Sequence, residues 1–562
     1  MLYRFQLPPN ISLEDLIISY RKAKVNCFFE IGQLTALKFS QYEQKLLENL
    51  ENLRDPIRGP ALDFAEAGYA VILKNIEFAN RHDDTGNNQG TKTYFSNAEQ
   101  AWTHTDLGGV WFRIIGQLPV DLHVISSLWI EKVGCHLEEK ITNNSYGCRL
   151  KRKSQSEGNF VSDSSGDSNR IDPLDLGHFR PYFQDYKNWQ ARGLEEAKKA
   201  ISNGKDIIVI TTDVKKFYHS IDAHFLLSAG FLEFLQVEYS PDQKAITQVL
   251  VSIIDTWSKK TFADPFVPED LKRNNHCGIP VGLAASKVIA NLLLAFFDSR
   301  IEEELGAIHF SRYVDDIIIV LPDNKRIKSA KDFWQFCSKR ISEFKIDGNK
   351  VYFDTSYAHN SIIEFGNGKD KLFVLEGTSG QTFLETIKKS LDENSSEWRM
   401  MPEPDTDLEE LNKQMTAATS FKEENVNSLR KSDGVSIQRL KFALKLRLFE
   451  SAVDLLPRSA WTNELKEFFQ LVYDFILLPE KLDTYTKYHP RILKLAIKAN
   501  WPEEASRIWD RIENAWDKLS DKAKQKGLVK DVSLISMARD YNRQLLTEAI
   551  YMSVSPDRNS YE

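Results

Sequence analysis

Apolar and polar positions along the first two thirds of the chain predict strands that end in carboxylates. The apolar run 207–210 predicts a buried strand, and Asp213 falls where that strand ends. A second apolar run, 317–320, directly follows Asp315 and Asp316, and an aromatic and polar run precedes them. The pattern therefore predicts a hairpin whose tip holds two aspartates.

The last third of the chain has helical spacing instead. No strand pattern is found after about residue 376. Successive amphipathic helices favour a HEAT-like array, with an ordinary helical bundle as the alternative. Thr462 or Asn463 is expected to cap one helix, and Asn500 with Pro502 to start another. The apolar sets at helical spacing are Leu440, Leu444, Leu448 and Ala452; Leu465, Phe468, Phe469, Val472 and Ile476; and Ala505, Ile508, Trp509, Ile512 and Trp516.

Three polar segments interrupt these patterns. An Asn/Gly/Thr-rich stretch at 83–93 and a Ser/Asp/Gly-rich stretch at 154–169 are expected to be loops. A cluster of Asn, Ser, Glu and Pro at 394–407 predicts a break between domains.

The two strand-end carboxylate positions suggest metal chemistry. Adjacent aspartates between apolar residues are costly unless something binds them, although an exposed Asp-Asp turn is the simpler alternative. Two such sites can chelate two Mg²⁺ ions together with substrate phosphates, and these ions serve an in-line phosphoryl displacement. Between the two sites, the segment 278–286 is rich in glycine and small residues, which let a nucleotide or template approach the backbone.

In this order and spacing the chain resembles the reverse transcriptases. The resemblance rests on Asp213 with an aromatic residue five positions on, the Gly-x-Pro-x-Gly-x-x-x-Ser segment at 278–286, and Tyr-x-Asp-Asp at 313–316. It continues upstream in Ser-Tyr-Gly-Cys-Arg at 145–149 and downstream in Asp-Gly-Asn-Lys at 347–350. It covers roughly residues 110 to 375.

The resemblance implies a set of catalytic and metal-binding residues. Asp213, Asp315 and Asp316 take the catalytic carboxylate positions. Asp213 and Asp315 would be direct metal ligands with the carbonyl oxygen of Val214, while Asp316 supports the site. The implied cofactor is Mg²⁺, with Mn²⁺ as the alternative ion.

It also implies a nucleotide-binding set. Tyr218 would lie beneath the sugar and exclude a 2′-hydroxyl, with a plain core aromatic as the alternative. Arg149 would contact the triphosphate and Lys350 would act as general acid, with a solvated surface position as the alternative for each. The full nucleotide-binding set is Arg149, Phe217, Tyr218, Pro280, Gly282 and Lys350.

Two departures and one further motif narrow the resemblance. Val281 stands where the family has glutamine, and Lys287 where it usually has proline. The missing amide argues against ordinary processive copying. The Asp-x-x-x-Phe-Tyr form of the first motif, preceded by the aromatic-rich run 179–189, is similar to the bacterial abortive-infection (AbiK-like) and related unknown-group antiphage reverse transcriptases.

That family implies an α+β fold: a right-hand fingers-palm reverse-transcriptase core followed by an all-α HEAT-like helical-repeat domain. The expected division is a mainly helical N-terminal extension with the start of the fingers (1–110), the fingers and palm (111–376), a linker (377–407) and the α-helical repeat domain (408–562).

The implied function is DNA synthesis from dNTPs in antiphage defence, untemplated or on a bound non-coding RNA. A protein tyrosine would prime synthesis, so the DNA product would be covalently attached, and the protein would form a trimer or hexamer. The priming residue is not fixed; the candidates on segments expected to be mobile are Tyr3, Tyr42, Tyr94, Tyr551 and Tyr561. The alternatives are a conventional templated reverse transcriptase of a mobile element and a non-catalytic nucleic-acid scaffold.

Composition adds limits. The net charge of −7 argues against loose, non-specific duplex binding, and the densest basic run is Arg149, Lys151, Arg152 and Lys153. Five scattered cysteines without zinc spacing fit a reducing, cytoplasmic setting. Residues 1–10 have no long apolar core, and no segment approaches about 20 uninterrupted apolar residues, so neither secretion nor a membrane span is expected.

Overall fold

The computed structural model describes residues 2–3, 7–29, 34–55, 62–63, 67–78, 98–152, 175–272, 276–366, 370–387, 416–419, 434–437 and 439–553. The chain forms two compact units. The first comprises Met1–Glu30, Lys38–Tyr69 and Gly116–Asp392, and the second comprises Ile31–Leu37, Ala70–Ile115 and Glu393–Glu562. The predicted loops at 83–93 and 154–169 and the predicted break at 394–407 lie outside the described residues.

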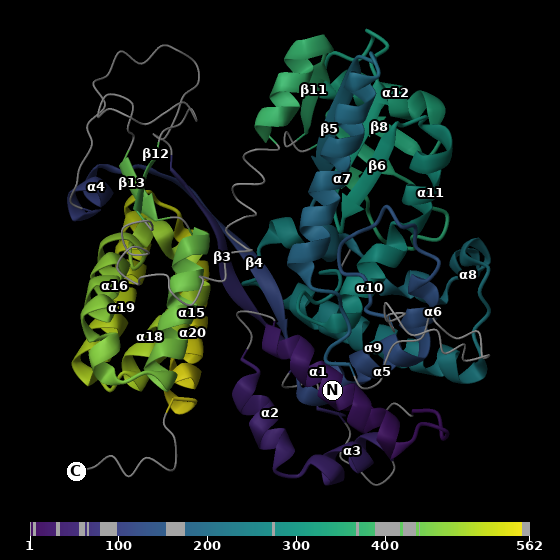
Figure 1. The fold of residues 1–562 in the computed structure, drawn as a ribbon. Coiled ribbons are helices and arrows are strands. Elements are labelled where there is room, and N and C mark those ends of the chain that lie inside the picture. Colours follow the sequence, from purple (N-terminus) through teal and green to yellow (C-terminus); the bar gives the residue numbers. More distant parts are fainter. Residues whose placement is uncertain are drawn as a thin grey trace, which may run out of the picture. The chain divides into compact units, whose positions relative to one another are not determined.

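A four-stranded antiparallel sheet with the order β11-β5-β7-β6 forms the centre of the first unit (Figure 1). Its strands are β5 (Ile207–Asp213), β6 (His309–Tyr313), β7 (Asp316–Pro322) and β11 (Lys371–Leu375). β5 and β7 pair along their full length, from Ile207 opposite Pro322 to Asp213 opposite Asp316. The predicted strands at 207–210 and 317–320 are confirmed, and Asp213 and Asp316 lie at the same edge of the sheet.

Helices make up most of the rest of the first unit, and α7 (Tyr182–Ser202) packs against three strands of this sheet. Among these helices, α10 (Ala284–Leu293) is buried on all sides, which explains its apolar composition, and α9 (Pro241–Ala263) begins with a capping box between Ser240 and Gln243. The other helices are α1 (Leu13–Phe29), α3 (Leu46–Arg54), α5 (Val120–Trp129), α6 (Cys135–Glu138), α8 (Ala229–Leu235), α11 (Ala295–Glu304) and α12 (Ala330–Arg340), while α2 (Ala36–Glu43) has its first two residues in the second unit.

A smaller antiparallel sheet, in the order β10-β9-β8, follows α12. Its strands are β8 (Phe344–Asp347), β9 (Lys350–Phe353) and β10 (Glu364–Phe365). Two short 3₁₀ turns, η2 (Phe217–Ser220) and η3 (Ala223–Leu227), follow β5. The amide of Lys215 donates to the Glu364 carbonyl at 2.8 Å and that of Ile362 to Ser220 at 2.8 Å, so the chain after β5 is tied to β10.

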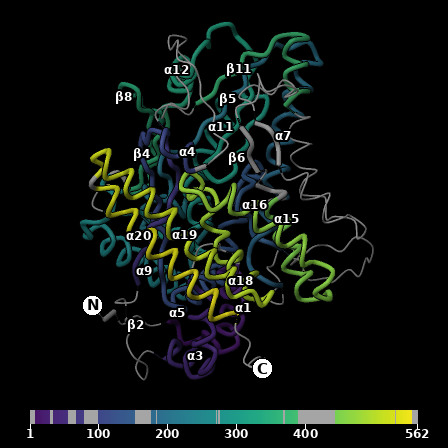
Figure 2. The backbone as a smooth tube through the Cα atoms, turned by 90° about the vertical axis from the view of Figure 1, so that its left-hand side faces the viewer, coloured from purple at the N-terminus to yellow at the C-terminus, as the bar shows by residue number. Residues whose placement is uncertain are grey.

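The second unit is mainly helical. Its C-terminal helices are α15 (Arg439–Leu455), α16 (Thr462–Phe475), α17 (Leu482–Tyr485), α18 (His489–Lys498), α19 (Pro502–Gln525) and α20 (Val529–Tyr551). α18, α19 and α20 pack against one another, and Figure 2 shows α19 and α20 side by side. Most of strands β3 (Gly68–Phe78) and β4 (Leu107–Gln117), together with α4 (Ala98–His104), also belong to this unit.

The structure corrects several details of the predicted helical region. Strands β12 (Thr416–Thr419) and β13 (Gly434–Ile437) form an antiparallel pair after residue 376, where no strand was predicted. Residues 416–419 read Thr-Ala-Ala-Thr, which does not alternate between apolar and polar residues, so no strand period marks them. The helix α16 begins at Thr462 without a side-chain cap, so the predicted capping by Thr462 or Asn463 is wrong.

The predicted helices are confirmed at all three apolar sets, but the buried face of α15 differs. Phe442, Leu446 and Phe449 are fully buried there, whereas Leu444 and Leu448 are half-buried. In α15, apolar residues lie on more than one face of the helix, so the sequence alone did not determine which face is buried against the neighbouring helices. In α16 and α19 the buried residues include most of those predicted.

Candidate active site

The three predicted carboxylates come together through strand register. Asp213 lies opposite Asp316, and the amide of Val214 donates to the carbonyl of Asp315 at 3.2 Å. Val314 and Asp315 form the two-residue turn between β6 and β7, since Tyr313 pairs with Asp316. Asp213 and Asp315 are half-buried and Asp316 is exposed. All three side chains are therefore accessible to solvent to some degree.

The turn itself is strained. Val314 has a φ of 59°, a left-handed conformation that β-branched residues rarely adopt. Such a conformation costs on the order of 1–3 kcal/mol and persists only where surrounding contacts enforce it. The geometry of the turn is therefore imposed by its neighbours.

A buried polar cluster supplies one of those contacts. The fully buried guanidinium of Arg312 donates to both carboxylate oxygens of Asp298, with Nε distances of 2.7 and 3.0 Å. It also donates to Asn291 Oδ1 at 2.7 Å and to the carbonyl of Val314 at 3.1 Å. Burial raises the pKa of Asp298 to about 6 against the opposing effect of Arg312. This cluster holds the turn from within the core.

The segment 145–147 supports the turn from the other side. A Cβ added to Gly147 would lie 2.6 Å from both the backbone nitrogen and Cγ2 of Val314. Tyr146 donates its amide to the carbonyl of Arg312 at 2.8 Å, and Asn291 donates to the carbonyl of Gly147 at 2.7 Å. Only glycine at position 147 allows this close approach.

The glycine-rich loop at 278–282 packs against the turn that carries Tyr218. The amide of Ile279 donates to the Tyr218 carbonyl at 2.9 Å, and a Cβ on Gly278, which has a φ of +72°, would lie 2.1 Å from that oxygen. The loop is tied to β4 as well, because the Gly116 amide donates to the Val281 carbonyl at 2.9 Å. The motifs thus form one connected backbone assembly around the carboxylates.

Comparison with known families agrees with this assembly. Residues 109–356 match the family model for reverse transcriptase (RNA-dependent DNA polymerase). The chain contains a reverse-transcriptase domain. The protein is therefore a nucleotidyltransferase, a DNA polymerase of the reverse-transcriptase type. A search of curated proteins finds no match.

Within the reverse-transcriptase domain, the predicted nucleotide-binding residues differ in accessibility. Tyr218 and Gly282 are half-buried at the site, and Lys350 is exposed at the start of β9, opposite Asp347. Phe217 and Pro280 are buried, and Phe217 lies in the hydrophobic core. The structure therefore gives Phe217 a packing role, while the nucleotide contacts of Tyr218, Gly282 and Lys350 stay predictions.

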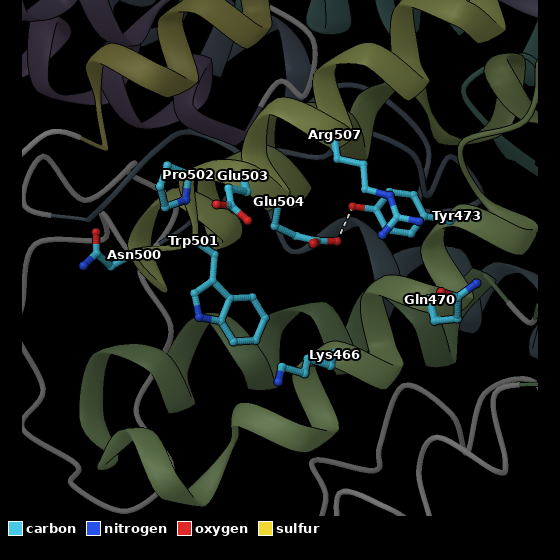
Figure 3. A pocket seen from close by; sticks show the side chains of 9 residues that line it. All are labelled: Lys466, Gln470, Tyr473, Asn500, Trp501, Pro502, Glu503, Glu504 and Arg507. Atoms are coloured by element: carbon cyan, nitrogen blue, oxygen red, sulfur yellow. Dashed lines mark hydrogen bonds between the residues drawn. The ribbon is translucent and has the colours of Figure 1, made fainter.

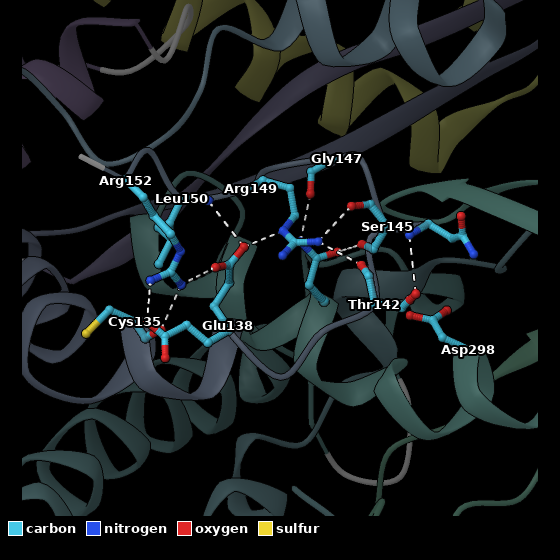
Figure 4. Close-up of polar contacts among 12 residues, drawn as sticks. Cys135, Glu138, Thr142, Ser145, Gly147, Arg149, Leu150, Arg152 and Asp298 are labelled. Atoms are coloured by element: carbon cyan, nitrogen blue, oxygen red, sulfur yellow. Dashed lines mark hydrogen bonds and ion pairs between the residues drawn. The ribbon is translucent and has the colours of Figure 1, made fainter. Parts of the chain in front are cut away.

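Arg149 is engaged inside the domain (Figure 4). It forms an ion pair with the buried carboxylate of Glu138 and donates from Nη1 to the carbonyls of Thr142 and Ser145, at 2.8 and 3.0 Å. The next basic residues are also paired: Arg152 with Glu138 and Glu139, and Lys151 with Asp175. These contacts favour a structural role for Arg149 over the predicted triphosphate contact, and they neutralise much of the basic run.

The sequence marks of the antiphage resemblance contact one another and the Tyr-x-Asp-Asp motif. Lys287 lies over the ring of Phe179, 5.1 Å from its centroid. Tyr186 and Trp189 of α7 pack on Tyr313, with ring centroids 5.0 and 6.0 Å away. The aromatic run 179–189 therefore supports the residue that begins the Tyr-x-Asp-Asp motif.

Sequence reasoning missed the residues that position the turn. Arg312, Asn291 and Asp298 come from β6, α10 and α11, and no local pattern links them. It also missed Lys215, which forms an ion pair at 2.9 Å with the buried carboxylate of Glu364. The signal for Lys215 was its position two residues after Asp213, but its partner lies far along the chain.

We call the strand ends that carry Asp213, Asp315 and Asp316 the carboxylate edge. The ligand atoms there fit a hard divalent ion. Asp213, Asp315 and the Val214 carbonyl offer oxygen atoms only, which Mg²⁺ prefers. In the described part of the chain, a different group of three residues has its ligand atoms within 4.8 Å of one another. It consists of Asp222, His224 and His359. Among the described residues, the predicted catalytic aspartates do not form such a group, so an ion there would need further ligands such as substrate phosphates.

A separate cavity of about 520 Å³ lies in the second unit (Figure 3). Tyr473 donates a hydrogen bond to Glu504 there, and the guanidinium of Arg507 stacks 4.4 Å from its ring centroid. Burial and the Glu504 carboxylate raise the pKa of Tyr473. None of the predicted catalytic residues lines this cavity, so we do not assign the polymerase chemistry to it.

No helix in the described part of the chain is both long and apolar enough to cross a membrane. All five cysteines are free: Cys27, Cys135, Cys277 and Cys337 are buried, and Cys148 is half-buried.

Proposed function

We propose that this protein is an antiphage DNA polymerase of the abortive-infection type, which adds dNTPs by two-metal catalysis. The observation that carries the proposal is the register of β5 and β7, which sets Asp213 opposite Asp316 and beside the Asp315 turn. The assignment to the defence type is supported by Val281, Lys287 and the aromatic run 179–189. A helical region after the polymerase domain is consistent with it.

The catalytic roles follow from the site. Asp213, Asp315 and the Val214 carbonyl would hold Mg²⁺ or Mn²⁺, which supplies charge stabilisation at the transferring phosphoryl group and activates the attacking hydroxyl. Tyr218 would limit the space beneath the sugar, and the hydrogen bond from the Ile279 amide to its carbonyl holds the backbone that carries the ring. Arg312 keeps the turn in place through the Val314 carbonyl, so Asp315 retains one orientation.

Synthesis is proposed to start on a tyrosine of the protein itself. Tyr42, one of the candidates, lies in α2 rather than on a mobile segment and donates to Asp121 at 2.6 Å. Burial and the Asp121 charge raise its pKa, which opposes loss of the phenolic proton. Tyr551 is 67% exposed at the end of α20. The side chains of Tyr3, Tyr94 and Tyr561 lie outside the described residues.

These differences favour Tyr551 over Tyr42 as the primer. Tyr186 packs near Asp316 but is fixed in α7, so it has little freedom to move away as the product grows. We therefore expect Tyr551→Phe to abolish protein-linked product and Tyr42→Phe to leave it. Retention of full labelling in Tyr551→Phe would exclude this residue as the primer.

Template use, assembly and location complete the proposal. Synthesis without a template, or on a bound non-coding RNA, is favoured by Val281, which lacks the amide of the family's glutamine. A HEAT-like helical region would support assembly into a trimer or hexamer in the cytoplasm.

One assay separates this function from its alternatives. The full-length protein is incubated with Mg²⁺ and each labelled dNTP, with and without an added primer and RNA template, and then denatured. Label that stays on the protein without added nucleic acid supports the defence polymerase. Label found only as free DNA, and only with primer and template, would indicate a conventional reverse transcriptase, and no incorporation would indicate a scaffold.

A further inference from the structure

A cluster of one aspartate and two histidines lies in the first unit, outside the carboxylate edge. Asp222 Oδ1 is 2.7 Å from His224 Nδ1, and Asp222 Oδ2 is 2.7 Å from His359 Nδ1. The imidazole rings are stacked, with centroids 5.3 Å apart. All three ligand atoms lie within 4.8 Å of one another. We propose that this cluster is a binding site for a first-row transition-metal ion of the Zn²⁺ class.

The donor chemistry sets the class of ion. Two imidazole nitrogens with one carboxylate suit Zn²⁺ and its transition-metal neighbours, whereas Mg²⁺ takes oxygen ligands and retains several waters. The site therefore selects a different ion from the one that the carboxylate edge would hold. Millimolar Mg²⁺ used in polymerisation would not occupy it.

The present spacing is close to that of a metal site. Ligand atoms around a tetrahedral Zn²⁺ lie about 3.3 Å apart, given bonds of about 2.0–2.1 Å. Each 2.7 Å distance joins one imidazole nitrogen to its own oxygen of Asp222, so the carboxylate and the rings would have to turn toward one ion and separate by roughly half an ångström. Both rings can make that movement, because the side chains of His224 and His359 are 40% and 48% exposed.

Other groups already orient the carboxylate. Asp222 is only 10% exposed, and it accepts hydrogen bonds from the His224 amide at 3.0 Å and from Asn360 Nδ2 at 2.9 Å. The Asp222 amide donates to Ser361 Oγ at 2.9 Å, which joins the two segments that supply the ligands. In metal sites, hydrogen-bond partners of this kind orient the side chains that bind the ion.

The cluster borders a cavity of about 430 Å³, which leaves room for a fourth ligand. Asp255, Lys259 and His276 also line this cavity. His276 accepts the Gly278 amide at Nδ1, 2.9 Å away, so Nε2 carries the proton of its neutral form. Nε2 meets no partner at full hydrogen-bond geometry among the described residues, and the Asn360 backbone interacts with the ring. His276 therefore joins the glycine-rich loop to the segment that carries His359.

The location gives the ion a structural consequence. Asp222 and His224 follow the 3₁₀ turn that carries Tyr218, and His359 belongs to the segment between β9 and β10. A bound ion would fasten these two segments together beside the glycine-rich loop, since Gly278 also lines the cavity. It would therefore raise the thermal stability of the protein by mass action.

The test uses full-length protein that has been stripped with a chelator and dialysed. Calorimetric titration with Zn²⁺, in a buffer containing Mg²⁺, is expected to show one saturable site per chain, and Co²⁺ is expected to give the visible absorption of a four-coordinate site. His359→Gln and Asp222→Asn should each weaken Zn²⁺ binding at least about tenfold. His136→Gln, which changes an exposed histidine elsewhere, should bind as the unaltered protein does.

The melting temperature of the stripped variants serves as the folding control, and the exposed His359 makes His359→Gln the safer of the two. Equal Zn²⁺ affinity in His359→Gln and the unaltered protein would overturn the proposal. So would occupation of the site by Mg²⁺ in competition with Zn²⁺, or binding that never saturates at one ion per chain. In that case the cluster is a hydrogen-bonded brace only.

Discussion

Val314 shows how a single residue is forced into a costly conformation at the centre of the site. Its left-handed backbone aims the carbonyl at Arg312 and sets Asp315 in a two-residue turn. A valine has no local reason to adopt this conformation, so the strain is offset by contacts from β6, α10 and the segment 145–147. The positions of the carboxylates thus depend on residues that do not touch the substrate.

At this scale, Asp315→Asn is expected to abolish nucleotide incorporation. Loss of one charged ligand removes several kcal/mol of charge stabilisation in the transition state, so the rate should fall about 1000-fold, or about 4 kcal/mol. Single-turnover dNTP incorporation measures this rate. Asp354→Asn, at an exposed position directly after β9, is the matched control, and ordinary activity in Asp315→Asn would end the two-metal interpretation.

Tyr218→Ala should relax the preference for deoxynucleotides. The smaller side chain leaves room for a 2′-hydroxyl, so the ratio of dNTP to NTP incorporation should drop. Tyr218→Phe keeps the ring and should preserve the ratio. If the alanine variant discriminates as well as the phenylalanine variant, the half-buried ring only packs, and another residue excludes the hydroxyl.

At the scale of elements, the strand ends were predictable and the supports were not. The apolar run before Asp213 and the one after Asp316 are each unbroken in sequence, so each run by itself identifies a buried strand, β5 or β7. The polar cluster of Arg312, Asn291 and Asp298 forms only in the folded chain, because its members come from different elements. No local sequence pattern predicts their contact. The buried face of α15 was missed for a related reason, because Leu444 and Leu448 have the same spacing as Phe442 and Leu446.

Gly147→Ala tests the contact between two elements. The added Cβ would meet the backbone of Val314 at 2.6 Å, so either the segment 145–147 or the turn must shift. We expect a loss of about 1–3 kcal/mol in stability and a larger loss in incorporation. Gly68→Ala is the control, because an added Cβ there has nothing within 4 Å. Equal activity of the two variants would show that the turn tolerates displacement.

At the scale of the whole molecule, the second unit is assembled from separated stretches of chain. In it, Lys522 of α19 lies 4.3 Å from the ring centroid of Trp102 in α4, and Lys518 pairs with Glu99 at 2.9 Å. The amide of Ile76 donates to Asp483 at 3.1 Å. The described residues 70–78 and 98–115 therefore depend on the C-terminal helices for part of their burial.

A chain truncated after residue 392 should consequently be poorly soluble. Removal of the C-terminal helices uncovers Trp102, which is 8% exposed in the full chain, and the apolar residues around it. Light scattering and thermal melting would compare this truncated chain with the full one. A monodisperse truncated protein with an unchanged melting temperature would show that strands β3 and β4 and helix α4 hold their structure without the C-terminal helices.

The proposed trimer or hexamer needs an exposed apolar surface. Trp461 and Trp516 are 4% and 0% exposed, so they belong to the core of the second unit. Leu455, at the end of α15, is 81% exposed. We expect a closed oligomer by light scattering at micromolar concentration, and Leu455→Asp to weaken it. Leu47→Asp, in α3, is the control, and a monomeric unaltered protein would contradict the assembly.

The buried cluster of Arg312, Asp298 and Asn291 also limits how this sequence can diverge. Replacing Asp298 alone leaves an uncompensated buried charge, at about 3–5 kcal/mol, whereas replacing the whole set with apolar residues of similar volume can be neutral. Single substitutions at Asp298 or Arg312 should therefore destabilise the protein, whereas a double substitution that removes both charges should be tolerated better. A library that varies positions 298 and 312 together would test this. Variants that retain nucleotide incorporation are expected to carry either both charges or neither.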